Sequence, residues 1–276
     1  MNLIADEIKI AADAIDRAAG ILIGAGAGMG VDSGLPDFRG NEGFWEAYPP
    51  MKKLGLSFYD LANPVWFNDD PSRAWGFYGH RRNLYRQTQP HTGFEILRRW
   101  VRAKSKGGFV FTSNVDGHFQ KAGFDEASIV ECHGAINFDQ CARPCCDEIW
   151  NSSENEIGVD LATFKASQPF PKCKHCDAMA RPNILMFGDF SWQQERTERQ
   201  YKCFSNWLNQ FDNGELVVIE LGAGTAVPTV RSQCEQISRR LGARLIRINP
   251  RESQGNDVLA IAKGAFESLS KIDAIL

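Results

Sequence analysis

Short apolar runs alternate with amphipathic stretches along most of this chain, and this alternation restricts its fold more than any other feature. An amphipathic segment at 3–19 is followed by the apolar run 21–23, and further runs that predict buried strands lie at 109–111, 184–187, 216–219 and 245–248. Helical periodicity is present at 72–85 and 94–103, and a last amphipathic helix is predicted at 258–272. Strands that alternate with helices predict a parallel sheet covered on both faces, in the α/β doubly wound, Rossmann-like class.

Residues 139–180 interrupt the alternation and are predicted to form a small zinc-binding insert. Five of the eight cysteines gather in this segment, which has little apolar periodicity. Reducing conditions in the cytoplasm disfavour disulfides, so the cysteine cluster indicates a metal site. We therefore expect three parts: a Rossmann-like domain at 1–138 and 181–276, the insert at 139–180, and a helical part of the small domain within 41–90.

The composition excludes several classes of protein. The chain has 276 residues, 43% of them hydrophobic, and a formal net charge of -3, which together rule out a disordered chain. No apolar run approaches the ~20 residues that a membrane span needs, and the amino-terminal segment lacks the apolar core of a signal peptide. A pI near 6.0 gives no general attraction to nucleic acid. We expect a cytoplasmic protein without membrane or nucleic-acid partners, and the oligomeric state stays open.

A glycine-rich turn directly follows the first predicted strand. Closely spaced glycines let backbone N–H groups approach a phosphate at a helix N-terminus. The dehydrogenase pattern G-x-G-x-x-G does not fit, because Met29 and Val31 occupy the positions of the third glycine. Taken alone, the turn is interpreted equally well as a phosphate site or as a tight turn without a ligand. Its residues are Gly26, Ala27, Gly28 and Gly30.

The blocks that follow resemble the signature of the sirtuins, a family of NAD-dependent protein deacylases. The G-L-P-D-F-R at 34–39, separated from Gly28 by five residues, is similar to the family's G-I-P-D-F-R. The T-S-N-V-D at 112–116 is similar to T-Q-N-x-D, and the H-G at 133–134 to the pair that contains the catalytic base. Further similar segments extend the resemblance over nearly the whole chain, at 181–189, 221–227 and 248–249.

The resemblance implies which residues bind NAD and which act in the reaction. Asn114 and Asp116 would orient the nicotinamide and its ribose. His133 would act as the general base, a role that suits the ordinary pKa of an imidazole. The full set of expected NAD contacts is Gly26, Ala27, Gly28, Gly30, Asp37, Phe38, Arg39, Ser113, Asn114, Asp116, Gly222, Ala223, Gly224 and Asn249.

Several positions depart from the sirtuin pattern. Gly30, Ala223 and Gly224 lack hydroxyl groups that the family usually has beside the cofactor, and Ser113 replaces a glutamine. His118 belongs to a pair that does not match the family, so we expect a partly exposed surface histidine without a catalytic role.

The resemblance also implies four zinc ligands. Cys141 lies where the first zinc cysteine of the family stands, and the C-x-x-C at 173–176 has the spacing of a zinc knuckle. In the first pair Pro144 occupies the position where sulfur is expected, so Cys145 or Cys146 must complete it. Cys145 is favoured because it requires the smaller departure. The expected ligands are Cys141, Cys145, Cys173 and Cys176.

The acyl-binding pocket is predicted from a second, shorter pattern. Tyr78 and Arg81 stand three residues apart on one helix face, similar to the Y-x-x-R of sirtuins that remove negatively charged acyl groups. A guanidinium binds a carboxylate well, but an arginine that merely solvates the helix surface is nearly as good an interpretation. Phe187 and Gly188 would also contact the acylated lysine, with Asp189 replacing a glutamate at the groove edge.

The function implied is NAD-dependent removal of acyl groups from lysine side chains of proteins or peptides, either as a deacetylase or as a desuccinylase and demalonylase. The family reaction releases nicotinamide and acyl-ADP-ribose, with a structural zinc elsewhere in the chain. Two alternatives stay open: an ADP-ribosyltransferase or NAD hydrolase on the same fold, and an NAD-binding sensor without catalysis.

Overall fold

The computed structural model describes residues 3–36, 40–154 and 156–276. A six-stranded sheet of entirely parallel pairs forms its larger part, in the order β11-β10-β9-β1-β2-β3. The central strand β1 has all six residues buried, as expected for a strand covered on both faces. The strands are β1 (Gly20–Ala25), β2 (Gly108–Thr112), β3 (Ile129–Glu131), β9 (Leu216–Leu221), β10 (Arg244–Ile248) and β11 (Val258–Ile261).

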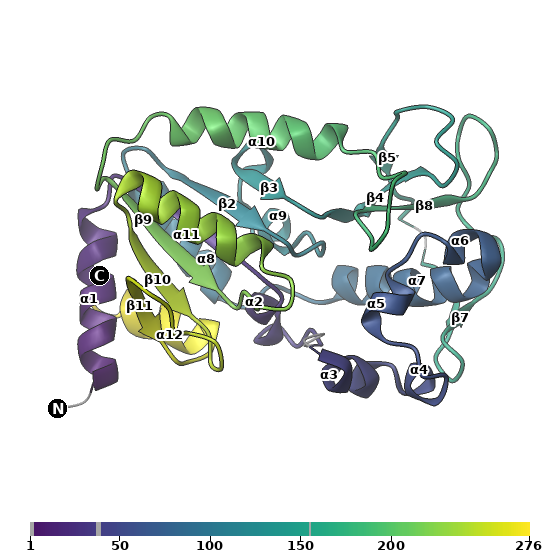
Figure 1. The fold of residues 1–276 in the computed structure, drawn as a ribbon, viewed down its shortest axis with the longest axis horizontal. Coiled ribbons are helices and arrows are strands. Elements are labelled where there is room, and N and C mark those ends of the chain that lie inside the picture. The colour runs from purple at the N-terminus through teal and green to yellow at the C-terminus, as the bar shows by residue number, and fades with distance from the viewer. Residues whose placement is uncertain (1–2, 37–39, 155) are drawn as a thin grey trace.

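Helices cover both faces of this sheet (Figure 1). Ile21 and Ile23 of β1 pack into a core with three helices, whereas Leu22 points to the opposite face and packs with two others. The first group is α1 (Leu3–Arg17), α8 (Gly93–Ala103) and α12 (Ala265–Asp273), and the second is α10 (Glu195–Leu208) and α11 (Thr229–Leu241). This is the α/β doubly wound, Rossmann-like arrangement, and the predicted fold class is confirmed.

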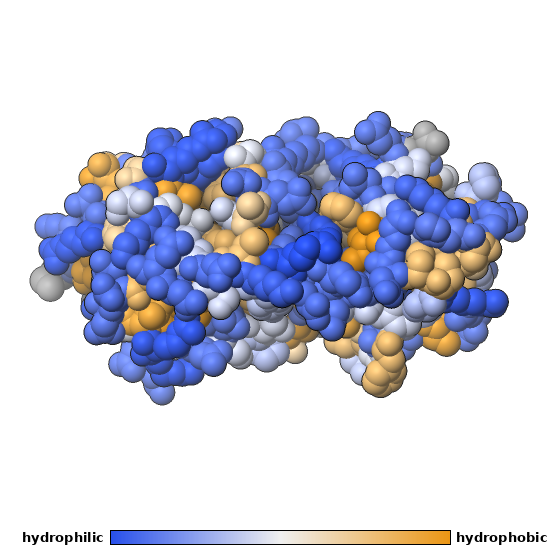
Figure 2. All heavy atoms as spheres, turned by 90° about the horizontal axis from the view of Figure 1, so that it is seen from above, coloured by the Kyte–Doolittle hydropathy of each residue, from blue (hydrophilic) through white to orange (hydrophobic). Residues whose placement is uncertain are grey.

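Helix α10 shows why these helices form where they do. Its buried side contains Phe204, Trp207 and Leu208, which pack against the sheet, while Glu198 and Lys202 are exposed. Seen from above, the molecule is mainly hydrophilic, with separate apolar patches between the polar groups (Figure 2). In the part of the chain that the structure describes, no helix is long and apolar enough to cross a membrane.

A smaller part of the molecule contains an antiparallel sheet and a group of helices. The sheet has the order β5-β4-β8. A separate two-stranded sheet consists of β6 and β7. These strands are β4 (Gly134–Cys141), β5 (Trp150–Asn151), β6 (Val159–Asp160), β7 (Lys165–Ala166) and β8 (Ala180–Ile184). Since β4 crosses the expected boundary at residue 139, the exact division into domains stays a prediction.

The helices of the smaller part surround an aromatic core. They are α3 (Gly40–Ala47), α4 (Pro49–Lys53), α5 (Phe58–Leu61), α6 (Trp66–Asp69) and α7 (Pro71–Gln87). Helix α7 begins at Pro71 because the Asp70 side chain accepts a bond from the backbone N–H of Arg73 and caps the first turn. Gly76 lets this helix lie close to β7, since a Cβ there would be 1.9 Å from the carbonyl oxygen of Phe164.

The remaining short elements follow β1 or lie between β2 and β3. They are α2 (Gly28–Val31), α9 (His118–Lys121) and the 3-10 helix η1 (Glu126–Ser128).

Two of the predicted elements are wrong. The run 184–187 is not a strand of the main sheet: β8 ends at Ile184, and the N–H groups of Leu185 and Phe187 donate to His133 and Ala62 instead of to a strand. The predicted helix at 258–272 begins only at Ala265, because Val258–Ile261 pairs with β10 as the edge strand of the parallel sheet. A four-residue apolar run fits either structure, and the available strand edge decides.

Candidate functional site

Two glycine-containing loops meet at the carboxyl ends of β1 and β9. The strand order reverses here, because β2 and β3 lie on one side of β1 whereas β9, β10 and β11 lie on the other. The N–H of Gly26 donates to the carbonyl of Leu221 at 2.9 Å, and that of Gly28 donates to Gly222 at 3.1 Å. Gly222 has φ +58, and a Cβ there would lie 2.4 Å from the Cα of Gly28. In doubly wound sheets the crevice at such a switch point is where ligands bind.

A small cavity of about 130 Å³ opens at this crevice. Gly28 and Gly222 line it, together with Ile248 at the end of β10 and Ala265 at the start of α12. It is smaller than the pockets that hold whole ligands, so it has room for only part of a dinucleotide. Gly28 and Gly222 place no side chain in this cavity, so a phosphate can lie close to their backbone, which fits NAD.

The remaining predicted NAD residues lie around the same edge, with differing exposure. Ala27 is exposed, whereas Gly30 is buried against Leu35. Ala223 is buried and Gly224 is half-buried in the loop after β9. Asp37, Phe38 and Arg39 lie outside the described residues.

Asn249 joins the loops that follow β9 and β10 by hydrogen bonds. It is fully buried, and its Nδ2 donates to the carbonyl of Ala223 at 3.0 Å. Its Oδ1 accepts bonds from the N–H groups of Arg251 and Glu252, both at 3.0 Å. The amide is therefore occupied in holding two loops, and its contact with adenosine stays a prediction.

The T-S-N-V-D segment at 112–116 lies at the end of β2 and forms hydrogen bonds with the glycine-rich turn and the end of β1. Asn114 donates from Nδ2 to the carbonyl of Gly26 at 3.1 Å, and the N–H of Ser113 donates to Ala25 at 3.2 Å. The buried carboxylate of Asp116 accepts a bond from the N–H of His118 at 2.9 Å. These bonds place the predicted nicotinamide-binding residues beside the predicted phosphate-binding turn.

His118 is buried, not exposed, so the prediction of a surface histidine is wrong. Its side chain is 1% exposed, because α9 packs its first turn against α7 and α8. Its Nε2 lies 3.4 Å from the carbonyl oxygen of Tyr85.

His133 stands where the main sheet passes into the smaller part of the molecule. Its carbonyl accepts a bond from the N–H of Leu185 at 3.0 Å, and its Nε2 lies 3.4 Å from the hydroxyl of Thr229. The side chain is half-buried, and burial lowers the pKa of this imidazole. The ring is therefore neutral near pH 7, the form in which a histidine accepts a proton.

Arg81 is buried rather than solvating the surface of α7. Its Nε and Nη2 donate to the phenol oxygen of Tyr85, at 3.0 and 2.8 Å, and its guanidinium lies 5.2 Å from the centre of the Phe77 ring. Burial works to lower the pKa of Arg81, but Tyr85, Tyr48 and Tyr78 raise it overall. Aromatic rings and a phenol group thus contact this buried cation.

Tyr78 is buried on the same helix, and its hydroxyl is without a hydrogen-bond partner among the described residues. Burial raises the pKa of this phenol, so it is present as a neutral donor. A buried hydroxyl without a partner is costly unless something else supplies one. Tyr85 was not predicted, although its position four residues after Arg81 on one helix is a signal for such a contact.

The predicted substrate residues of the next segment lie at the surface. Phe187 is half-buried and its ring centre lies 4.2 Å from that of Tyr59, while Gly188 is exposed with φ +67. The Asp189 carboxylate is buried and accepts bonds from Arg181 at 2.7 and 3.0 Å. A place for Asp189 at the groove edge stays a prediction.

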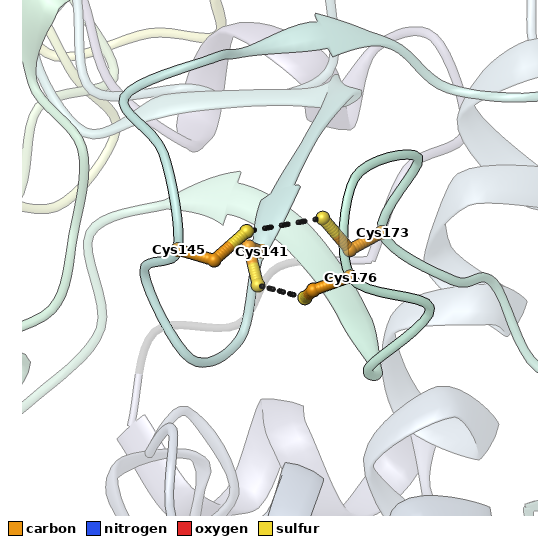
Figure 3. Close-up of side chains that lie close together, drawn as sticks. All are labelled: Cys141, Cys145, Cys173 and Cys176. Atoms are coloured by element: carbon orange, nitrogen blue, oxygen red, sulfur yellow. Dashed lines mark hydrogen bonds between the residues drawn. The ribbon is translucent and has the colours of Figure 1, made fainter.

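Four cysteines converge in the insert, from the end of β4 and the two loops beyond it (Figure 3). Their sulfur atoms all lie within 4.8 Å of one another. Cys141 and Cys176 are 3.7 Å apart at Sγ, and Cys145 and Cys173 are 3.6 Å apart. Tetrahedral zinc with Zn–S bonds of about 2.3 Å requires sulfur atoms ~3.8 Å apart, so the four thiols fit zinc.

Cys146 is outside this group. Its Sγ lies 3.7 Å from that of Cys145 but is not within reach of all the others. All eight cysteines are free thiols, so no disulfide competes for the cluster. The structure therefore brings together the four cysteines that the sequence predicted as ligands.

A larger hollow of about 520 Å³ lies beside α10, away from these residues. Arg196 lines it and already binds Glu126 and Glu131, at 3.1 and 2.6 Å. None of the predicted site residues lines this hollow.

Comparisons with known proteins agree with the geometry. The NAD-dependent protein deacylase of Aquifex aeolicus is 28% identical over 230 residues, which cover 83% of this chain and 82% of that protein. The protein of the same name from Thermus thermophilus is 26% identical, with coverage of 96% and 93%.

Solved structures share the fold. A Sir2 homologue in complex with NAD has a TM-score of 0.71 and 21% identity, and covers 97% of this chain and 93% of its own. A Sir2 structure with a deacetylated p53 peptide and 3'-O-acetyl ADP-ribose has a TM-score of 0.66 and 20% identity, with coverage of 97% and 98%. The model of the Sir2 family matches residues 26–216. Because this match spans more than half of the sequence, the chain belongs to the Sir2 family.

Proposed function

We propose that this protein is an NAD-dependent deacylase of lysine side chains and that it prefers acyl groups bearing a carboxylate. The position of His133 is the observation that supports the reaction. A neutral imidazole stands between the start of α11, which follows the Gly222 loop, and the segment that follows β8. Family membership, with relatives named as NAD-dependent protein deacylases, supports the same activity.

NAD would supply a ribose carbon that becomes reactive as nicotinamide leaves, and a ribose hydroxyl beside it. Gly28 and Gly222 line the small cavity in which its phosphates would lie close to the backbone. Asn114 and Asp116 orient the nicotinamide end, and His133 accepts the proton of the ribose hydroxyl. The cysteine cluster has no part in these steps, because zinc held by four thiolates has no open position for a substrate.

The preference for acidic acyl groups is supported by the surroundings of Arg81. Its guanidinium contacts a phenol and aromatic rings, and Tyr78 adds a neutral hydroxyl without a partner among the described residues. A carboxylate accepts hydrogen bonds from both kinds of donor, whereas an acetyl methyl group accepts none. In a water-poor site such charge-assisted bonds are the strong ones.

The test is a product analysis with NAD and peptides that contain acetyl-, malonyl- or succinyl-lysine. We expect nicotinamide and acyl-ADP-ribose in equal amounts, with acidic acyl groups removed faster. Nicotinamide with plain ADP-ribose would identify an NAD hydrolase, and ADP-ribose attached to protein would identify a transferase. Binding of NAD without release of nicotinamide would identify a sensor. Equal efficiency on acetyl and succinyl peptides would reject the acyl preference alone.

A further inference from the structure

The hydroxyl of Thr229 lies 3.4 Å from Nε2 of His133, and nothing in the sequence blocks points to this contact. Thr229 is the first residue of α11 and is half-buried, just beyond the loop whose Gly222 contacts the glycine-rich turn. One threonine thus joins the helix after β9 to the predicted general base.

The backbone of His133 is fixed on both sides, but its ring is not. Its carbonyl accepts the bond from Leu185, and Gly134 follows with φ +76, packed so closely that a Cβ would lie 2.1 Å from the carbonyl oxygen of Asn183. In the described part of the chain, the Thr229 hydroxyl is the one side-chain group within hydrogen-bonding distance of the imidazole. The orientation of the ring therefore depends on this contact.

The Thr229 hydroxyl does not serve as a helix cap for α11. Threonine often caps a helix, but the N-cap of α11 is Pro228 and makes no side-chain cap bond. Among the described residues, His133 is the only hydrogen-bond partner of the Thr229 side chain. Helix formation alone does not require a hydroxyl at this position.

We propose that Thr229 is a positioning residue for His133, whose hydroxyl donates to Nε2 and keeps the imidazole proton on Nδ1. A neutral imidazole has one donor and one acceptor nitrogen, so a bond donated to Nε2 makes that nitrogen the acceptor. At 3.4 Å the bond is long and weak, so a substrate hydroxyl can displace it at the same nitrogen. The inference rests on the proposed role of His133 as general base.

The kinetic test compares Thr229→Val, which removes the hydroxyl at nearly constant shape, with Thr229→Ser, which retains it. We expect kcat to fall about tenfold in Thr229→Val, with KM for NAD within about twofold, because a misoriented base slows the chemical step. Thr229→Ser should recover to within about threefold of the wild type. Thr163→Val is the control: it removes an exposed hydroxyl that bonds Asp160 in the insert, and kcat should not change.

Either of two kinetic results would overturn the proposal. One is a kcat for Thr229→Val within twofold of the wild type. The other is an equal loss in Thr229→Ser, which would show that the methyl group matters instead of the hydroxyl.

A second readout does not depend on activity. ¹⁵N NMR of histidine-labelled protein distinguishes the two imidazole tautomers, and the His133 signals are assigned by their loss in His133→Ala. We expect the Nδ1–H tautomer in the wild type and in Thr229→Ser, and a shift toward Nε2–H in Thr229→Val. An unchanged tautomer in Thr229→Val would contradict the proposal. If the wild type produces no acyl-ADP-ribose, the proposed function fails, yet this measurement still decides whether Thr229 sets the state of His133.

Discussion

At the scale of single residues, the proposed chemistry depends on the neutral imidazole of His133, which stands between β3 and β4. His133→Ala removes the proposed proton acceptor without filling the space around the glycine loops. We expect turnover to fall by at least ~100-fold, the lower end of the usual contribution of a general base. Binding of NAD, measured by calorimetry, should persist. Full turnover by the variant would exclude His133 as the base.

The pH dependence follows from the burial of the same ring. Burial lowers the pKa of His133, so the imidazole stays neutral below the ordinary value of about 6.5. Because the neutral form is the active one, kcat/KM should decline on the acid side only below pH ~6.5 and stay level above it. A profile from about pH 5 to about pH 8 tests this. An acid limb centred at or above the ordinary pKa would contradict the assignment.

Arg81→Met tests the acyl pocket, because methionine retains much of the apolar contact with Phe77 but loses the charge. A charge-assisted hydrogen bond contributes roughly 1.5–3 kcal/mol. The ratio of kcat/KM for succinyl over acetyl peptides should therefore fall by about one to two orders of magnitude. Arg73→Met on the same helix removes a partly exposed guanidinium paired with Asp70, and should leave the ratio unchanged. An unaltered ratio in Arg81→Met would count against the pocket.

Much of the candidate site was predictable at this scale, but its contacts were not. The resemblance identified His133, Cys141 and the pair at 173–176 through local motifs with fixed spacing, whereas Cys145 was favoured only as the smaller departure from that spacing. Thr229 was missed because it meets His133 only through the folding of α11 over the sheet. The burial of His118 was likewise invisible, since it depends on packing between helices far apart in sequence.

At the scale of elements, the contact between α7 and the β6–β7 pair depends on a single glycine. In an isolated helix Gly→Ala is stabilising by about 1 kcal/mol. Here the added methyl would meet the carbonyl oxygen of Phe164 at 1.9 Å, so Gly76→Ala should instead destabilise by about 1–3 kcal/mol.

Denaturant unfolding measures the effect of Gly76→Ala. Gly158→Ala is the matched control, because the nearest atom to its Cβ would be 3.9 Å away, an ordinary contact. A change within about 0.5 kcal/mol is expected for this control. A stabilised Gly76→Ala would show that α7 can move away from the strand pair.

The predicted elements succeeded where periodicity and length agreed. The long helix α7 was predicted nearly to its ends, and the apolar runs 21–23 and 216–219 lie within β1 and β9. The runs at 184–187 and 258–261 failed because four apolar residues do not distinguish strand from helix or loop. The structure of each run depends on which neighbouring segment is available for hydrogen bonding. That neighbour is known only once the whole chain has folded.

At the scale of the whole molecule, the cysteine cluster is expected to stabilise the insert without holding the parallel sheet. We expect about one zinc per chain by elemental analysis, and its loss in Cys173→Ser but not in Cys146→Ser, since Cys146 lies outside the group. Removal of zinc with a strong chelator should lower Tm by roughly 5–10 °C.

Hydrogen exchange shows where that stability is lost. Residues 141–176 should lose protection on chelation, while β1 and β9 keep theirs, because local stability follows local contacts. Equal loss of protection in the sheet would contradict this division of stability. Stoichiometric zinc retained in Cys173→Ser would refute the ligand set.

The position of β1 at the centre of the sheet has a consequence for how the protein is made. One neighbour, β2, follows within the first half of the chain, but the other, β9, leaves the ribosome roughly 200 residues after β1, about 10–40 s later at typical rates of synthesis. Until then an apolar central strand has one open edge, available to other nascent chains. Chains that terminate before β9 should therefore aggregate, and full-length yield should rise when chaperones cover the open edge during synthesis.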